Sequence, residues 1–366
     1  MREKKTVLVA MSGGVDSSVT AALLKEQGYN LIGVTMLVWP EDQPDPERPG
    51  ACCSLSAVED ARRVANTLEI PYYVMNFRDL FQEKVIDYFI QEYLGGKTPN
   101  PCIACNQYVK FEALLRKAIA LGADYVATGH YAQVFFDQSR GRFLLKKALD
   151  TSKDQTYVLY NFTQEQLSRI LLPLGAYTKT QIRELAKKMG LISVAEKPES
   201  QEICFVADND YRRFLREKAG KEIKPGPFLD KKGNIIGTHQ GIPYYTIGQR
   251  KGLGLALGKP AYVIDIIPEK NGVVIGEQKD LLNNKLVSAQ NNFILIEDLD
   301  KPMEVTAKIR YKSEEAPAII TPLGDKRVKV EFREPEKAIT PGQAIVYYQG
   351  DFVVGGGVIE KGNDFF

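Results

Sequence analysis

A loop rich in glycine and hydroxyl side chains lies near the N-terminus, between an apolar run and a helical repeat. Its string is Ser12-Gly13-Gly14-Val15-Asp16-Ser17-Ser18. Residues 7–11 are apolar, as in a buried strand, and Val19, Ala22 and Leu23 recur at helical spacing. Glycines allow close backbone approach, and a helix start attracts anions. The side chain of Asp16, Ser17 or Ser18 can cap the helix that follows. The string therefore predicts a phosphate-binding turn, although an ordinary capped turn would share its Gly-Gly pair.

The same loop lacks the lysine of a Walker-type sequence. A GxxxxGK[ST] loop places a lysine on the terminal phosphates of a nucleotide, and residues 12–18 contain none. A kinase-like transfer of the γ-phosphate is therefore not expected here.

Cysteines are the second set of reactive residues. The chain has five, at positions 52, 53, 102, 105 and 204, against two histidines, His130 and His239. Two histidines exclude a histidine-rich metal site. No signal peptide or bilayer-spanning stretch is visible, so we expect a cytoplasmic protein, in which such cysteines are catalytic or metal-binding before they are disulfides. The alternative for Cys105 and Cys204 is a pair of small buried apolar side chains.

The patterns of apolar and charged residues along the chain predict three parts, which position these reactive residues. Residues 1–207 alternate apolar strands with helices, as in an α/β domain with a parallel sheet, and about 152–192 reads as a helical extension. Residues 208–283 form a small, basic, β-rich central part. Residues 284–366 read as short strands with period-two alternation, clearest in "RVKVEFRE", and predict a C-terminal β-barrel.

Charge is distributed unevenly along the chain. The formal net charge is +2, yet residues 205–260 hold eleven Lys and Arg against five Asp and Glu. A local excess of this kind marks a possible footprint for the phosphates of a nucleic acid, and a solvated surface is the alternative.

"SGGVDSS" after a strand resembles the PP-loop of the ATP pyrophosphatases, which split ATP into AMP and pyrophosphate. Together with "TPNPCIACN", "ESQEICF" and "GTHQGIPYYTIGQRKGLGL", it makes nearly the whole chain similar to the tRNA-specific 2-thiouridylases. That resemblance implies sulfur for oxygen exchange at O2 of the wobble uridine of tRNA. It also implies a sulfur donor such as a cysteine desulfurase or a sulfur-relay protein.

The resemblance assigns roles to individual residues. Asp16 is expected to help hold Mg²⁺ on the ATP phosphates. The residues placed at ATP are Ala10, Met11, Ser12, Gly13, Gly14, Val15, Asp16, Ser17, Met36 and Gly129. Those placed at tRNA are Asn100, Pro101, Cys102, His130, Lys153, Asp154, Gln155, Arg310, Tyr311 and Gln343.

Two sulfur mechanisms remain open. In the family's scheme Cys204 carries a persulfide and Cys105 resolves it. Many family members have Asp where this chain has Cys102, however, and Cys102, Cys105 and Cys204 would together suit a [4Fe-4S] cluster. A CxxC pair alone would also fit a redox pair or a zinc site.

Two rival functions use fewer of these features. A PP-loop amidotransferase acting on a small molecule would need an ammonia source, and no glutaminase-like segment is visible. A non-catalytic RNA-binding protein would leave the loop and the paired cysteines unexplained.

Overall fold

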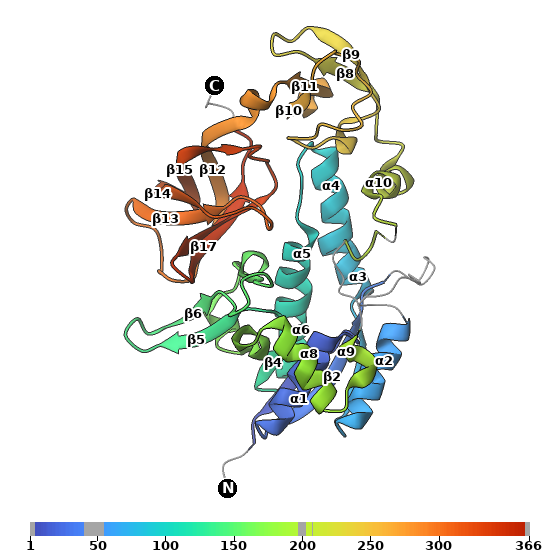
Figure 1. Cartoon of the computed structure of the whole chain (residues 1–366), viewed down its shortest axis with the longest axis vertical. Coiled ribbons are helices and arrows are strands. Elements are labelled where there is room, and N and C mark those ends of the chain that lie inside the picture. Colours follow the sequence, from blue (N-terminus) through green and yellow to red (C-terminus); the bar gives the residue numbers. More distant parts are fainter. Residues whose placement is uncertain (1–3, 40–54, 197–202, 207, 363–366) are drawn as a thin grey trace. The chain divides into compact units, whose positions relative to one another are not determined.

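The computed structural model describes residues 4–39, 55–196, 203–206 and 208–362 (Figure 1). The chain divides into two compact units. Unit 1 comprises Met1–Ile86, Cys102–Asn209 and Asp351–Val353, and unit 2 comprises Asp87–Pro101, Asp210–Gly350 and Val354–Phe366.

Unit 1 contains a five-stranded sheet in the order β3-β2-β1-β4-β7. The strands are β1 (Thr6–Ala10), β2 (Asn30–Leu37), β3 (Tyr72–Asn76), β4 (Tyr125–Ala127) and β7 (Ile170–Leu171). All four pairings are parallel, which confirms the predicted α/β class. The order reverses at β1, because β2 and β3 follow on one side and β4 and β7 on the other. The loops that leave the carboxyl ends of β1 and β4 therefore lie at the point where the strand order reverses, the usual ligand position in such sheets.

Helices α1 (Val15–Glu26), α8 (Lys179–Lys188) and α9 (Ile192–Ala195) pack together beside this sheet. Their apolar side chains belong to one buried cluster with β1, in which Val19 of α1 and Ile182 of α8 have no exposed surface. This packing fixes the position of α8 relative to α1. Helix α2 (Leu55–Thr67) packs against β2 and β3.

The segment predicted as a helical extension is only partly helical. Helix α7 (Gln164–Leu167) and the helices α8 and α9 agree with the expectation, but β7 interrupts them. Val126 and Ala127 of β4 pair with Ile170 and Leu171, so strand pairing overrides helical spacing in this short apolar run. A hairpin of β5 (Gln133–Asp137) and β6 (Arg142–Lys146) was not anticipated.

The first part of unit 2 is a four-stranded sheet in the order β10-β11-β8-β9. Its strands are β8 (Gly226–Leu229), β9 (Ile235–His239), β10 (Tyr262–Ile267) and β11 (Gly272–Gly276). Helix α10 (Tyr211–Ala219) packs on α4 (Tyr88–Leu94), where the Tyr93 and Tyr211 rings stack with centroids 5.1 Å apart. The central β-rich part is confirmed.

The second part of unit 2 is a closed antiparallel barrel in the order β12-β15-β14-β13-β16-β17, with β17 pairing back to β12. Its strands are β12 (Leu282–Phe293), β13 (Met303–Lys308), β14 (Ala316–Gly324), β15 (Arg327–Lys337), β16 (Ala344–Gln349) and β17 (Phe352–Ile359). Along β15, Val328, Val330 and Phe332 are buried, as the alternation predicts. Within the described ranges, no helix combines the length and apolar character needed to cross a bilayer.

Candidate active site at the start of helix α1

The loop after β1 is anchored at its first residue and constrained at one glycine. The Met11 amide donates to the Val34 carbonyl at 2.8 Å, and the Thr35 hydroxyl donates to the Met11 carbonyl at 2.6 Å. Gly13 has φ +69°, and a Cβ there would lie 2.3 Å from the carbonyl oxygen of Ala57 in α2. At Gly14 a Cβ would meet nothing closer than 3.6 Å. Gly13 is thus the position where glycine is required.

The hydroxyls of this loop do not cap α1, contrary to expectation. The Ser17 and Ser18 hydroxyls donate backward to the Gly14 carbonyl, at 3.2 and 2.8 Å. The Ser12 amide donates to the Ser17 hydroxyl at 3.1 Å. Because no side chain in the described part of the chain caps the helix at Gly14, the first turn of α1 retains its attraction for an anion.

An ion pair that sequence analysis missed lies at this helix start. Lys179, the first residue of α8, donates to both carboxylate oxygens of Asp16 at 2.8 Å, and the Tyr131 hydroxyl donates to one of them at 2.7 Å. Lys179 is 8% exposed. A signal was available, because "TKTQ" at 178–181 forms a capping box that marks a helix start, where a lysine faces the unfavourable end of the dipole. Such a cation needs an anion close by.

The loop after β4 closes on the same point. A Cβ on Gly129 would lie 2.8 Å from the backbone carbon of Asp16 and 2.9 Å from the Ser17 nitrogen, so Gly129 lets this loop rest on the start of α1. Gln155 holds the backbone of Tyr131 through two hydrogen bonds. The side-chain oxygen of Gln155 accepts from the Tyr131 amide at 2.8 Å, and the backbone amide of Gln155 donates to the Tyr131 carbonyl at 2.9 Å. The structure thus brings Gly129 to the first loop and uses Gln155 to position Tyr131.

His130 is a buried, neutral side chain. Its Nδ1 lies 2.7 Å from the Thr128 hydroxyl, and its ring packs on Phe111 with centroids 5.5 Å apart. Burial, and then the positive charge of Lys110, hold the pKa of His130 well below its ordinary value. The residue therefore adds no positive charge to the site at neutral pH.

Hydrogen bonds hold Lys153 and Asp154 in a turn, and strand pairing holds Met36. Asp154 accepts from the Ala148 amide at 3.0 Å and from the Thr156 hydroxyl at 2.6 Å. The Lys153 amide donates to the Asp150 carbonyl within a turn. Met36, in β2, pairs with Met75 of β3.

The cysteines differ in exposure. Cys102 is exposed, whereas Cys105 and Cys204 are partly buried. Cys105 begins a π-helix, η2 (Cys105–Ala113), a rare form that is frequent at functional sites. Helix α3 (Arg78–Phe81) contacts η2, and its Phe81 ring meets Phe205 edge-on at 5.9 Å. The segments that carry Cys105 and Cys204 therefore both pack on α3.

Beside Cys105, Asn106 has an unsatisfied atom. Its amide nitrogen donates to the Val158 carbonyl at 3.0 Å, and its buried Oδ1 has no hydrogen-bond partner among the described residues. Nothing in the sequence signalled this.

The arrangement does not fit a three-cysteine cluster site. Over the ranges that the structure describes, no three His, Cys, Asp or Glu side chains gather closely enough to hold a metal ion. Cys102, Cys105 and Cys204 all belong to those ranges. Cys52 and Cys53 lie outside the described residues.

In unit 2, two residues expected at tRNA are engaged with the protein backbone. The Gln343 amide nitrogen donates to the Thr98 carbonyl at 2.7 Å and so supports the segment that leads into Asn100 and Pro101. The Arg310 guanidinium donates to the Lys337 and Ala338 carbonyls. Tyr311 is 38% exposed. Pro101 begins helix α5 (Pro101–Ala104).

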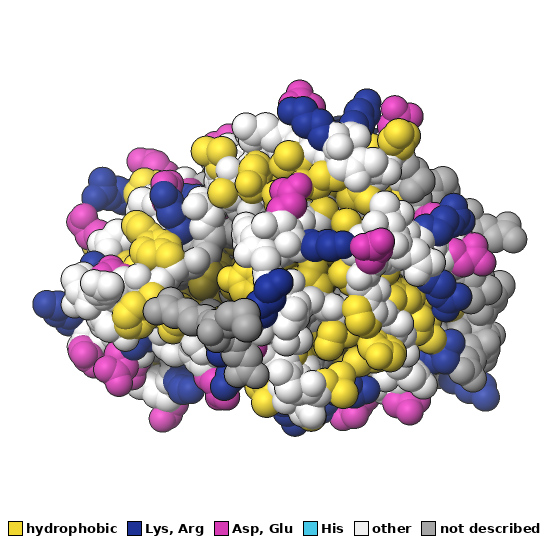
Figure 2. Space-filling model, turned by 90° about the horizontal axis from the view of Figure 1, so that it is seen from below, with side chains coloured by type: hydrophobic (Ala, Val, Ile, Leu, Met, Phe, Trp, Pro, Cys, Tyr) yellow, Lys and Arg dark blue, Asp and Glu magenta, His cyan; other side chains and the backbone are white. Residues whose placement is uncertain are grey.

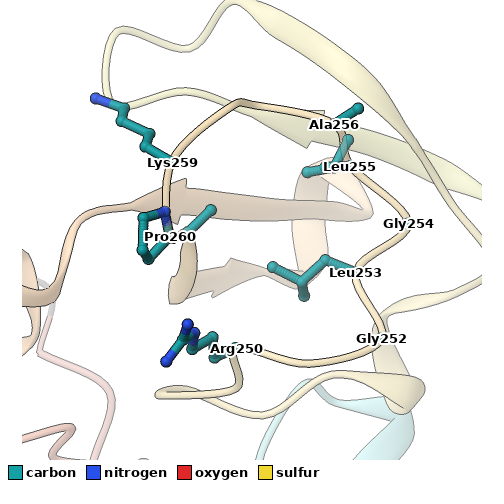
Figure 3. Close-up of a pocket in the computed structure, with 9 residues that line it drawn as sticks. Arg250, Gly252, Leu253, Gly254, Leu255, Ala256, Lys259 and Pro260 are labelled. Atoms are coloured by element: carbon teal, nitrogen blue, oxygen red, sulfur yellow. The ribbon is translucent and has the colours of Figure 1, made fainter.

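A hollow of about 430 Å³ lies in the basic part of unit 2. Leu253 and Leu255 point into it, and Lys259 points away (Figure 3). Arg212 of α10 lies against this loop, since a Cβ on Gly252 would sit 3.5 Å from its guanidinium. Carboxylates outside residues 205–260 neutralise part of the positive charge of that range. Lys231 pairs with Asp280, and Lys259 pairs with Glu277. On the face shown in Figure 2, Lys and Arg are interspersed with Asp and Glu.

Three family models match the chain. Residues 5–208 match the tRNA methyl transferase HUP domain, residues 212–277 the tRNA methyl transferase PRC-barrel domain, and residues 283–359 the aminomethyltransferase beta-barrel domain.

Curated relatives are similar over almost their full length. The tRNA-specific 2-thiouridylase MnmA of Carboxydothermus hydrogenoformans is 60% identical over 98% of both chains. A tRNA-specific 2-thiouridylase MnmA 2 of Caldanaerobacter subterraneus subsp. tengcongensis is 61% identical over 99% of both. Among solved structures, a 4-thiouridine synthetase–RNA complex with bound ATP matches at 17% identity and a TM-score of 0.34, covering 60% of this chain and 51% of the other.

Gly13→Ala tests the loop geometry. The left-handed backbone and the clash with the Ala57 carbonyl should together lower the free energy of unfolding by roughly 1–3 kcal/mol, measured by urea denaturation. Gly14→Ala is the matched control and should change it by less than about 1 kcal/mol. Equal effects of the two substitutions would contradict this account.

The pKa of His130 predicts a pH dependence of stability. Burial also lowers the pKa of His239, so both histidines bind fewer protons in the folded state than in the unfolded one. The free energy of unfolding should therefore fall as pH drops below about 6.5, by up to about 1.4 kcal/mol per pH unit for each histidine. His130→Gln should flatten this slope between about pH 7 and pH 5.5, with His239→Gln as the comparison. An unchanged slope in His130→Gln would refute the assignment.

Proposed function

Because the chain belongs to the tRNA-specific 2-thiouridylase family, and is therefore an ATP-dependent tRNA-uridine sulfurtransferase, we propose that it thiolates the wobble uridine at position 2 through an adenylated intermediate. The supporting observation is identity of about 60% over nearly the whole chain. The loop geometry agrees with it, because an uncapped helix start at the point where the strand order reverses suits a nucleotide phosphate.

The first step activates the base. O2 of the uridine attacks the α-phosphorus of ATP, a bond from O2 to phosphorus forms, and the bond to the pyrophosphate breaks. In this proposal residues 10–17, with Met36 and Gly129, bind the ATP. Mg²⁺ offsets the phosphate charge, and Asp16 is the carboxylate at this helix start that would hold it.

The second step transfers sulfur. The terminal sulfur of a Cys204 persulfide attacks C2, and AMP leaves with the former O2. The Cys105 thiolate then attacks the Cys204 sulfur, which releases the thiolated base and leaves a Cys105–Cys204 disulfide for a thiol reductant to reduce. The packing of both cysteine segments on α3 supports this pairing. A cysteine desulfurase or a sulfur-relay protein would supply the persulfide.

A [4Fe-4S] cluster on Cys102, Cys105 and Cys204 is the alternative, and the arrangement of these side chains does not favour it. Neither does the exposed position of Cys102.

The names of the family models mention methyl transfer. A methyl transfer requires neither a pyrophosphatase-type loop nor a pair of cysteines, whereas sulfur transfer uses both. We therefore favour sulfur over methyl as the transferred group.

The tRNA would contact several parts of the chain. We propose residues 1–207, 208–283 and 284–366 as the functional divisions, with the base bound near Asn100, Pro101, Cys102 and His130. Lys153, Asp154, Gln155, Arg310, Tyr311 and Gln343 are proposed as further tRNA contacts or as supports for them. The anticodon loop is single-stranded, so a base there can turn outward at low cost.

On α10, Arg216 is the exposed arginine, while Arg213 donates to both oxygens of Glu217 at 2.6 and 2.7 Å. Arg216 is therefore the better placed of the two to meet a phosphate.

The cysteines give the decisive test of the sulfur step. Cys105→Ser and Cys204→Ser should each reduce 2-thiouridine to the detection limit, because each removes an obligatory sulfur, while release of pyrophosphate from ATP persists. Cys102→Ser is the matched control and should keep most of the wild-type rate. Nucleosides from treated tRNA are quantified by mass spectrometry, with iron content measured in parallel. Loss of both iron and activity in Cys102→Ser would overturn the persulfide scheme in favour of the cluster.

The affinity for tRNA should depend on salt. If about five phosphates are neutralised, log K should fall with log salt at a slope of roughly −3 to −4. Arg216→Gln should weaken binding and reduce the slope by about 1. The charge-neutral double variant Arg213→Gln/Glu217→Gln should change the slope little. A slope near zero in the wild-type protein would mean that the basic side chains of residues 205–260 do not bind the phosphates of tRNA.

A further inference from the structure

We propose that Lys179 is the phosphate-binding cation of the ATP site, and that it exchanges partners when MgATP binds. Without nucleotide its ammonium group is held by Asp16. With MgATP, the Asp16 carboxylate coordinates the metal from its place and Lys179 turns to the phosphate oxygens. The inference deepens the proposed function and rests on its ATP-dependent step.

The position of Lys179 supplies what the loop lacks. Residues 12–18 hold no lysine, yet the structure brings an ammonium group to the start of α1 from 163 positions further along the chain. Its Nζ lies 2.8 Å from each Asp16 oxygen, at the second residue of the helix. The ammonium group is therefore held within the first turn of the helix whose uncapped start would attract a phosphate.

The surroundings make this pair dependent on an anion. Lys179 is 8% exposed, and a buried cation without a counter-ion is costly. It also begins α8, where the helix dipole disfavours positive charge. Asp150 accepts from the Lys179 backbone amide at 3.0 Å. Both oxygens of Asp16 accept from the ammonium group itself.

Binding of Mg²⁺ would break this arrangement. Mg²⁺ is coordinated by carboxylate and phosphate oxygens together. When Asp16 coordinates the metal, it neutralises less of the positive charge of Lys179. The ammonium group then needs another anion, and the ATP phosphates supply it. Tyr131, whose hydroxyl binds Asp16 at 2.7 Å and whose backbone is fixed by Gln155, keeps the carboxylate in place during the exchange.

The alternative is a purely structural ion pair between α1 and α8. In that case removing Lys179 would lower the stability of the protein without changing its affinity for ATP. Stability and nucleotide affinity therefore have to be measured separately.

The experiment is calorimetric titration of the full-length protein with ATP, in Mg²⁺ and in EDTA, without tRNA or sulfur donor. Lys179→Met should weaken MgATP binding about 10- to 100-fold, and Lys179→Arg should restore most of it. Lys188→Met, an exposed lysine on the same helix, is the control and should bind as wild type does. Urea denaturation of each variant reports stability.

Asp16→Asn gives a result of opposite sign in the two media. Removing the carboxylate should weaken MgATP binding, because the metal loses a ligand, but strengthen binding of metal-free ATP, because Lys179 no longer has to leave Asp16. The double variant Asp16→Asn/Lys179→Met should lose that gain. This comparison remains informative if Lys179→Met alone fails to fold.

Two results would overturn the inference: wild-type affinity for MgATP in Lys179→Met, or no gain in affinity for metal-free ATP in Asp16→Asn. Failure of the wild-type protein to bind MgATP would instead refute the ATP-dependent step, and with it the inference. Binding of ATP with no thiolation of tRNA would count against the sulfur chemistry and leave the role of Lys179 standing.

Discussion

The reversal of strand order at β1 is the constraint on which the candidate site depends. Because β4 pairs in parallel with β1, on the edge opposite to β2, the loops that leave β1 and β4 begin at the same end of the sheet, and the loop after β4 contacts the start of α1. Each of these loops carries a glycine at a close backbone contact. At Gly13 a side chain would strike the Ala57 carbonyl, and at Gly129 it would strike the backbone of Asp16. Close backbone contact, rather than a special side chain, therefore sets the geometry of the candidate site.

The sequence was sufficient for the features that are local. The Gly-Gly turn and the alternation along β15 each follow from residues within about ten positions of one another. The parallel sheet follows from the repeated alternation of such short strand and helix patterns. Helix capping at Asp16, Ser17 or Ser18 was predicted incorrectly, because the two serine hydroxyls bond back to Gly14 and Asp16 meets a distant lysine. Spacing identifies a side chain that can make a contact, and the contact it makes depends on its neighbours in space.

The features that sequence analysis missed are those formed between distant segments. Lys179 meets Asp16 across most of unit 1, and β7 is two residues long, so neither leaves a periodic signal. The same limit applies to Gln343 and Arg310. Both were assigned to tRNA through the family resemblance, and the structure gives both a backbone carbonyl as partner. A residue that supports a loop and a residue that touches the ligand beside it look alike in sequence.

The division of the chain into two units has a consequence for how the protein is made. The chain passes from one unit to the other after residues 86, 101, 209, 350 and 353, and Phe352 pairs with Lys146 within unit 1. A ribosome that has delivered residue 209 has therefore not yet delivered every part of unit 1. Neither unit is a continuous length of chain that could be cut out and expressed alone. Unit 1 cannot be complete before residues 351–353 have been synthesised, which exposes the nascent protein for longer than a sequential arrangement of domains would.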